Sequence, residues 1–113
     1  MVAQVKQRLL VLLVELEQEL RQLGYWERQA PSVHALQSPQ PFCVDTLDFS
    51  QWLQWVFAPR MLSIVHSDHA LPQQCAIYEM AAVAYREQPA AVAGLLSCLK
   101  SIDATIMAPR LLH

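Results

Sequence analysis

Residues 49–61 decide how this chain folds, and they read Phe49-Ser-Gln-Trp-Leu-Gln-Trp-Val-Phe-Ala-Pro-Arg-Met61. The stretch holds two of the three tryptophans and two of the three phenylalanines in the chain, together with a single cation, Arg60. Aromatic and aliphatic side chains at this density are typical of a segment buried in a core. We therefore expect a central helix here, with the rest of the chain packed around it.

The central helix is expected to begin near Asp48, because Asp48 and Gln51 have the spacing of a capping-box variant. The pair Asp45-Thr46 offers a competing cap just upstream. Pro59 removes one backbone hydrogen bond, so the helix either kinks there or splits into two helices. We favour one kinked helix that runs to about His66.

A long first helix is indicated upstream. Apolar residues recur at steps of three and four over residues 2–23, and Gly24 is suited to end the helix in the left-handed conformation. Leu10, Val11 and Val14 lie off this stripe. They could widen the buried face or meet a second subunit.

Two more helices are expected downstream, over residues 73–86 and 90–107. Pro89 suits the first turn of the last helix, and Pro109 is expected to end it. The chain has only two glycines and lacks the strict alternation typical of strands. The prediction is an all-α fold, a four-helix antiparallel bundle in one domain over residues 1–113.

The connection between the first two helices is unusually long. Residues 27–46 hold three prolines, which favour a loop over a helix. Val33, Leu36 and Phe42 are apolar enough to pin this segment across the helices. We expect an ordered, Pro-rich strap rather than a free loop, and long ordered loops are often functional.

Composition limits the classes of function. The chain is 54% hydrophobic and only 16% charged, so apolar surface can exceed what a monomer of 113 residues buries. That surplus predicts an association face or an apolar cavity. The net charge is −2 and the eight basic residues are scattered, so we expect no direct binding to nucleic acid.

The cysteines indicate the compartment. Cys43, Cys75 and Cys98 are odd in number and far apart, which fits free thiols in a reducing cytoplasm. The short apolar run Leu9–Val14 is followed at once by acidic residues, unlike a signal peptide. Charge-free stretches fall short of the ~20 apolar residues that a membrane helix needs. We therefore expect a soluble, cytoplasmic protein.

The core Trp52-Leu-Gln-Trp-Val-Phe-Ala-Pro-Arg-Met61 resembles the signature of the YqcC-like family of small bacterial proteins. The agreement covers about residues 5–106 and includes Trp26 and the Leu71-Pro72 and Tyr78-Glu79 pairs. Ala58 and Leu47 are mild departures from the family pattern. The resemblance implies a small all-α bundle and no established activity, so no catalytic residues carry over. Genes of the family that the chain resembles often lie beside the gene of a tRNA pseudouridine synthase.

Arg60 is the first candidate for a functional site. A buried guanidinium needs an ion-pair partner. The candidate partners of Arg60 are the carboxylates of Asp45, Asp48 and Glu79. We favour a structural tether, in which Arg60 holds the strap onto the central helix by charge-assisted bonds. Arg60 could instead anchor an anion in a pocket, or extend into solvent.

Trp52 and Trp55 are the second candidates. They lie 60° apart around the helix axis and are expected to belong to the core, although either could form a ligand wall or an interface anchor. The alternative binding site therefore comprises Arg60, Trp52, Trp55 and Asp45.

The loop at residues 66–69 is the third candidate. His66, Asp68 and His69 have metal-ligating chemistry, but they sit together in one short turn. We expect a solvated loop, with no metal and no cofactor.

These observations favour a non-enzymatic helical interaction module that self-associates or binds a protein partner. The first alternative is a small-molecule or anion-binding protein, or an enzyme, with its site near Arg60. The second is an accessory factor in tRNA modification, which rests on gene neighbourhood within the resembled family.

Overall fold

The computed structural model describes residues 2–40, 43–68, 70–72 and 75–111. Over this part of the chain the fold is helical and contains no strand, which confirms the all-α class. The described chain has more helical segments than the four that were predicted. The segments in chain order are α1 (Val2–Gln22), α2 (Val33–Leu36), α3 (Phe49–Trp52), the π-helical turn η2 (Leu53–Phe57), α4 (Ala58–Val65), α5 (Ile77–Ala84), the 3-10 turn η3 (Pro89–Val92) and α6 (Ala93–Leu111).

Helix α1 follows its apolar stripe. The stripe is buried between Leu9 and Leu20, and its most enclosed members are Leu9, Leu12, Leu16 and Leu20. Gly24 ends the segment with a φ of +76°, and the N–H of Tyr25 donates to the carbonyl of Leu20 at 2.9 Å. This left-handed stop confirms the predicted end of the first helix. The off-stripe residues Val11 and Val14 are exposed.

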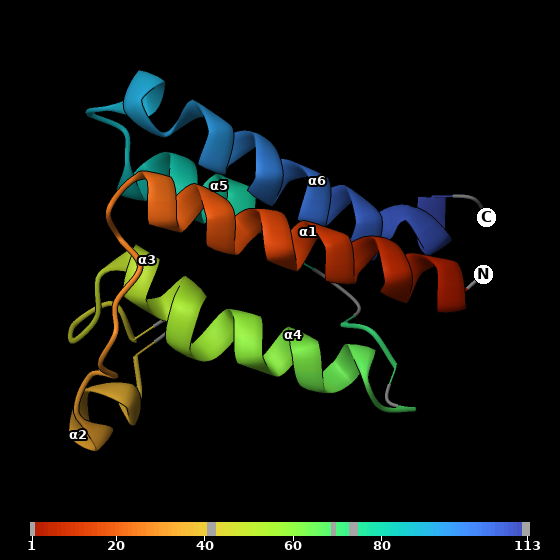
Figure 1. The fold of residues 1–113 in the computed structure, drawn as a ribbon, viewed down its shortest axis with the longest axis horizontal. Helices are drawn as coiled ribbons and strands as arrows, with labels where there is room; N and C mark the ends of the chain where they lie inside the picture. Colours follow the sequence, from red (N-terminus) through yellow and green to blue (C-terminus); the bar gives the residue numbers. More distant parts are fainter. Residues whose placement is uncertain (1, 41–42, 69, 73–74, 112–113) are drawn as a thin grey trace.

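Segments α3, η2 and α4 form one unbroken helical rod (Figure 1). At its start the N–H of Asp48 donates to Oε1 of Gln51 at 2.8 Å, which confirms the capping box. Just before Pro59 the backbone hydrogen bonds change to the π-helical pattern, in which the N–H of Ala58 donates to the carbonyl of Leu53. The prediction that the helix does not split at Pro59 is confirmed, and the helix ends at Val65, next to the expected His66. Its irregular turn lies directly before Pro59, the residue that cannot donate a backbone bond.

Where it is described, the strap over residues 27–46 contacts the central helix and the core, but the residues that pin it differ from the prediction. Val33 is 69% exposed, so its predicted role is wrong, while Leu36 packs against the core. Helix α2 is a single turn, so only part of it can face inward. Cys43 near the end of the strap and Leu47 directly after it are buried and hold this end against the core. Phe42 lies outside the described residues.

The last two helices depart from their predicted bounds. The third helix was predicted over residues 73–86, whereas α5 covers only Ile77–Ala84. Pro89 opens η3, in the position expected of it. The prediction that Pro109 ends the last helix is wrong, because α6 runs to Leu111. A proline removes only one backbone donor, so a helix can extend past it near its end.

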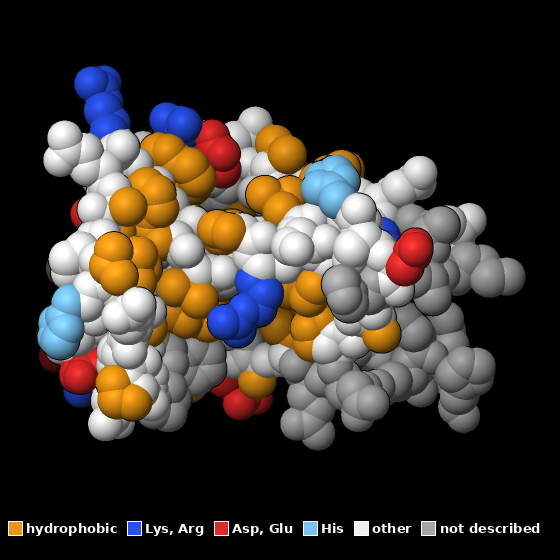
Figure 2. Space-filling model, turned by 90° about the horizontal axis from the view of Figure 1, so that it is seen from below, with side chains coloured by type: hydrophobic (Ala, Val, Ile, Leu, Met, Phe, Trp, Pro, Cys, Tyr) orange, Lys and Arg blue, Asp and Glu red, His pale blue; other side chains and the backbone are white. Residues whose placement is uncertain are grey.

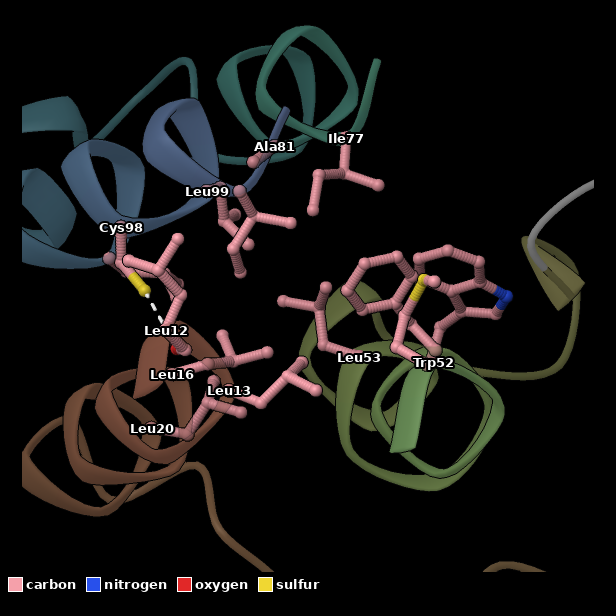
Figure 3. Packing of buried hydrophobic residues seen from close by; sticks show 14 of the residues in the cluster. Leu12, Leu13, Leu16, Leu20, Trp52, Leu53, Ile77, Ala81, Cys98 and Leu99 are labelled. Atoms are coloured by element: carbon pink, nitrogen blue, oxygen red, sulfur yellow. Dashed lines mark hydrogen bonds between the residues drawn. The ribbon is translucent and has the colours of Figure 1, made fainter. Parts of the chain in front are cut away.

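The core lies between α1, α6 and the central rod. Helices α1 and α6 lie side by side and run in opposite directions, and α5 packs on α6 (Figure 1). Figure 3 shows Leu53 pointing into the centre, toward the leucines of α1, with Trp52 on the outer side of it. Leu53, Leu99 and Ala81 are fully buried. The π turn therefore delivers one of its own side chains to the middle of the core.

Segment Pro89–Met107 is long and apolar enough to cross a membrane by length and composition, although it carries Lys100 and Asp103. Core helices of folded domains pass the same test. In this fold the segment packs its apolar stripe against α1 and α5. The buried members of that stripe are Val92, Leu95, Leu99, Ile102 and Ile106.

Candidate functional site

Arg60 lies exposed on α4, and the predicted tether is absent. Within the described part of the chain, its guanidinium forms no ion pair with Asp45, Asp48 or Glu79. Asp45 accepts a hydrogen bond from the hydroxyl of Ser38, inside the strap. Asp48 begins the rod twelve residues before Arg60, which at 1.5 Å per residue places it about 18 Å away along the axis. The prediction that Arg60 holds the strap is therefore wrong.

Arg60 instead borders a pocket of about 360 Å³ between the central rod and α5. We call it the Arg60 pocket. Trp52, Phe57 and Met61 supply its wall on the rod, and Ile77 and Met80 supply its wall on α5. The remaining lining residues are Pro72, Cys75, Ala76 and Glu79. Apolar and sulfur-containing side chains dominate the lining, and Arg60 and Glu79 are its two charged members.

The four residues of the sequence-predicted site divide between three places. Trp52 is buried in the wall of the Arg60 pocket, so the structure brings Trp52 and Arg60 together. Trp55 lies on another side of the rod, where its indole Nε1 donates to Oε1 of Glu27 at 3.1 Å. Asp45 stays in the strap. The pocket thus unites two of the four residues.

Glu27 is the point at which the strap is fastened to the rod. The buried side-chain amide of Gln54 accepts from the N–H of Glu27 at 2.9 Å and donates to its carbonyl at 2.7 Å. The Glu27 carboxylate also accepts from Gln51 and Trp55. Sequence reasoning missed this site. Its signal was a pair of glutamines three residues apart inside an otherwise apolar helix.

A second apolar hollow, of about 300 Å³, lies between α1 and α4, and we call it the α1/α4 groove. Val14 and Leu62 line it and are 54% and 37% exposed. Trp26 forms part of its wall, and the guanidinium carbon of Arg21 stacks 4.9 Å from the centre of that ring. Its other lining residues are Leu13, Leu16, Glu17, Leu20, Gln54, Ala58 and Pro59.

Figure 2 views the molecule from the α4 side. Apolar side chains gather in several patches on this face, and a basic group lies between two of them (Figure 2). Leu62 of α4 is one of the exposed large apolar residues of the described chain.

Asp103 is a structural carboxylate that sequence reasoning did not single out. Its oxygens accept from the backbone N–H groups of Ile77 at 3.1 Å and Tyr78 at 2.9 Å, so α6 caps the first turn of α5. Burial, followed by the hydrogen bond and the charge of Asp103, raises the pKa of the Cys75 thiol to about 12. Cys75 therefore remains a neutral thiol at physiological pH.

The loop after α4 offers little for a metal. His66 and Asp68 are exposed, and His69 lies outside the described residues. Over the residues that the structure describes, no three His, Cys, Asp or Glu side chains gather closely enough to hold a metal ion.

Together, the fold and these hollows define a small all-α protein with two apolar pockets beside a π-containing central helix. The chain belongs to the YqcC-like family, DUF446, whose description reads "tRNA pseudouridine synthase C" and which matches residues 8–105. It is 37% identical over 92 residues to the uncharacterized protein YqcC of Escherichia coli K12, covering 79% of this chain and 82% of that one. The solution NMR structure of E. coli YqcC matches with a TM-score of 0.82 and 31% identity, over 95% of this chain and 90% of that chain.

For two further relatives, the match covers only part of the relative's length. An uncharacterized protein of Haemophilus influenzae is 42% identical over 65 residues, which span 58% of this chain and 61% of that protein. A protein of Pectobacterium carotovorum named tRNA pseudouridine synthase C is 41% identical over 61 residues, or 54% of this chain. The match spans only 16% of that synthase's length.

Proposed function

We propose that this chain is a non-enzymatic interaction module that binds a tRNA pseudouridine synthase. The observation that carries the proposal is the homologous segment within the Pectobacterium protein of that name, which occupies 16% of its length. Joining two domains in one chain raises the effective concentration of each for the other. Domains that gain from such joining in one organism are good candidates for binding as separate chains in another.

The α1/α4 groove supports the proposal by offering a docking surface. Val14 and Leu62 are exposed on either side of it, and Val11 extends the apolar area along α1. A tryptophan at the wall, Trp26, is the type of residue that dominates binding energy at interfaces. In the proposed complex, an apolar side chain of the synthase fills this groove.

The charge of the chain supports a partner that is protein rather than RNA. With a net charge of −2, the chain lacks the clustered cations that neutralise phosphates. In this proposal the synthase makes all contacts with tRNA, and the module acts on the synthase's stability or orientation.

Co-purification tests the proposal. The chain carries an affinity tag and is mixed with the tRNA pseudouridine synthase of the same organism. We expect the synthase to elute with the wild-type chain and to be lost with Val14→Glu or Leu62→Glu, because each change places a charge in the groove. Val83→Glu is the matched control, since Val83 is 58% exposed on α5 and lies outside the groove. A synthase that fails to elute with the wild-type chain refutes the proposal.

Self-association is the second candidate, and the exposed pair Val11 and Val14 on α1 favours it. Light scattering behind a sizing column distinguishes the two. A dimer of the isolated chain that Val14→Glu dissociates supports self-association. A monomer at high concentration excludes it and leaves the synthase as the partner to be tested.

A further inference from the structure

The Arg60 guanidinium lies beside an apolar pocket and has no ion-pair partner among the described residues. Arg60 is exposed on α4, and no described carboxylate pairs with it. A surface arginine that serves only solubility can lie anywhere on the surface. Arg60 borders a hollow of about 360 Å³. That volume lies within the ~300–1,000 Å³ typical of small-molecule sites.

The walls of the pocket suit an apolar tail. Trp52 and Phe57 offer aromatic surface, with ring centroids 5.5 Å apart, and Met61 and Met80 add flexible thioether side chains. Aromatic and methionine side chains bury large apolar areas and adapt to ligand shape. Because the lining is mainly apolar, the pocket favours hydrocarbon over a sugar or a hydrated ion.

The charges at the pocket select the head group. A guanidinium presents a planar fork of N–H donors that matches a carboxylate. Glu79, the other charged lining residue, adds one negative charge close by. A polyvalent anion such as a phosphate ester would find only one cation here, Arg60, and would be repelled by the carboxylate of Glu79. A single carboxylate is therefore the anion that these two residues fit best.

We propose that the Arg60 pocket binds a small apolar monocarboxylate, with its tail against Trp52 and Phe57 and its carboxylate on the Arg60 guanidinium. This site is independent of the α1/α4 groove, because Arg60 lies outside the groove and Val14 and Leu62 lie outside the pocket. The proposal thus does not depend on a synthase partner.

Binding at this site is reversible. Cys75 is the nucleophilic side chain in the lining, and it is a neutral thiol at physiological pH because burial and Asp103 oppose its ionisation. A free carboxylate is also not an electrophile, because it has no leaving group for a thiol to displace, so the proposed ligand makes no covalent bond to Cys75. The affinity comes from apolar contact and from the charge-assisted bonds to Arg60.

Octanoate is the probe, and octan-1-ol is its uncharged counterpart. Binding is followed by amide chemical shifts in ¹H–¹⁵N NMR spectra and quantified by titration calorimetry. We expect octanoate to bind the wild-type chain with a Kd below about 1 mM and to shift the amides of Met61, Ile77 and Met80. Shifts confined to Val14 and Leu62 would place the ligand in the groove and overturn the proposal, as would the absence of binding.

Three variants separate the charge effect from folding. Arg60→Met keeps the length of the stem, and we expect it to weaken octanoate about tenfold while leaving octan-1-ol unchanged, because a hydrogen bond to a charged group is lost. Glu79→Gln should strengthen octanoate binding by removing a repulsion. Arg8→Met, an exposed arginine of α1, is the control and should leave the affinity unchanged. Equal octanoate binding by Arg60→Met and the wild type refutes the site, as does weaker binding by Glu79→Gln.

Discussion

The side-chain amide of Gln54 forms two hydrogen bonds with the backbone of Glu27, accepting from its N–H at 2.9 Å and donating to its carbonyl at 2.7 Å. Gln54 is the buried polar residue of the π turn, and Glu27 begins the strap. A glutamine amide can mimic a neighbouring peptide group, with one acceptor and one donor side by side. This pair, rather than an ion pair of Arg60, fastens the strap to the central rod.

Replacing Gln54 with leucine removes both bonds and leaves the Glu27 peptide groups without their partner. We expect the free energy of unfolding to fall by about 1–3 kcal/mol, measured by urea denaturation. Gln18→Leu is the control, because Gln18 is exposed on α1 and should change stability by less than about 0.5 kcal/mol. Equal effects of the two substitutions would show that the clamp contributes nothing.

Replacing Asp103 with alanine removes the cap that α6 places on α5. The N–H groups of Ile77 and Tyr78 lose their acceptor, and we expect a loss of about 1 kcal/mol in stability. Hydrogen exchange of these two amides should also accelerate. Asp68→Ala, in the exposed loop, serves as the control. Unchanged protection of both amides would contradict the assigned role.

Gly24→Ala tests the left-handed stop of α1. The φ of +76° disfavours any residue with a Cβ, and the added methyl group would touch nothing within 4 Å, so the cost is purely conformational. We expect a loss of about 1 kcal/mol. Gly94→Ala is the comparison, because its Cβ would lie 2.2 Å from a Glu19 carboxylate oxygen, which can rotate away. The Tm of Gly24→Ala should be clearly lower than the Tm of Gly94→Ala, and the reverse order would refute this account.

Stability should fall at alkaline pH, in part through Cys98. Burial, and then the charges of Glu15 and Glu19, raise the pKa of the Cys98 thiol from 9.0 to about 12. Between these two pKa values the unfolded chain releases the Cys98 proton and the folded chain keeps it. The contribution of the neutral Cys98 thiol to the free energy of unfolding is therefore fully present below pH 9 and is lost as the pH rises toward 12. Cys98→Ser has no group that titrates in this range. Urea midpoints measured from pH 8 to 11 should fall less steeply for Cys98→Ser, and parallel curves would contradict the prediction.

Local signals in the sequence predicted the helical part of this fold well. The stripe of α1, Gly24 and the Asp48–Gln51 capping box each depend on residues within a few positions of one another, and each has the predicted outcome. The bounds of α5 and the continuation of α6 past Pro109 were not predicted. Short helices and helix ends depend on packing partners rather than on local preference.

The candidate site was predicted in part. Arg60 and Trp52 share one pocket because both border the space between the rod and α5, and the sequence predicted the rod that carries them. The hydrogen bond of Trp55 to Glu27 and the isolation of Asp45 in the strap depend on how the chain folds back over itself. No local pattern encodes that path.

The amino-acid sequence by itself determined the all-α class, the central aromatic helix, its cap and the family of this chain, because periodicity, caps and motifs act over short spans. Only the tertiary structure decided which polar groups meet. Gln54 finds Glu27 across 27 positions, and Asp103 finds Ile77 across 26. Such contacts exist only once buried apolar faces fix the helices against one another. The same packing places Arg60 at the edge of an apolar pocket, where no carboxylate of the described residues forms an ion pair with it.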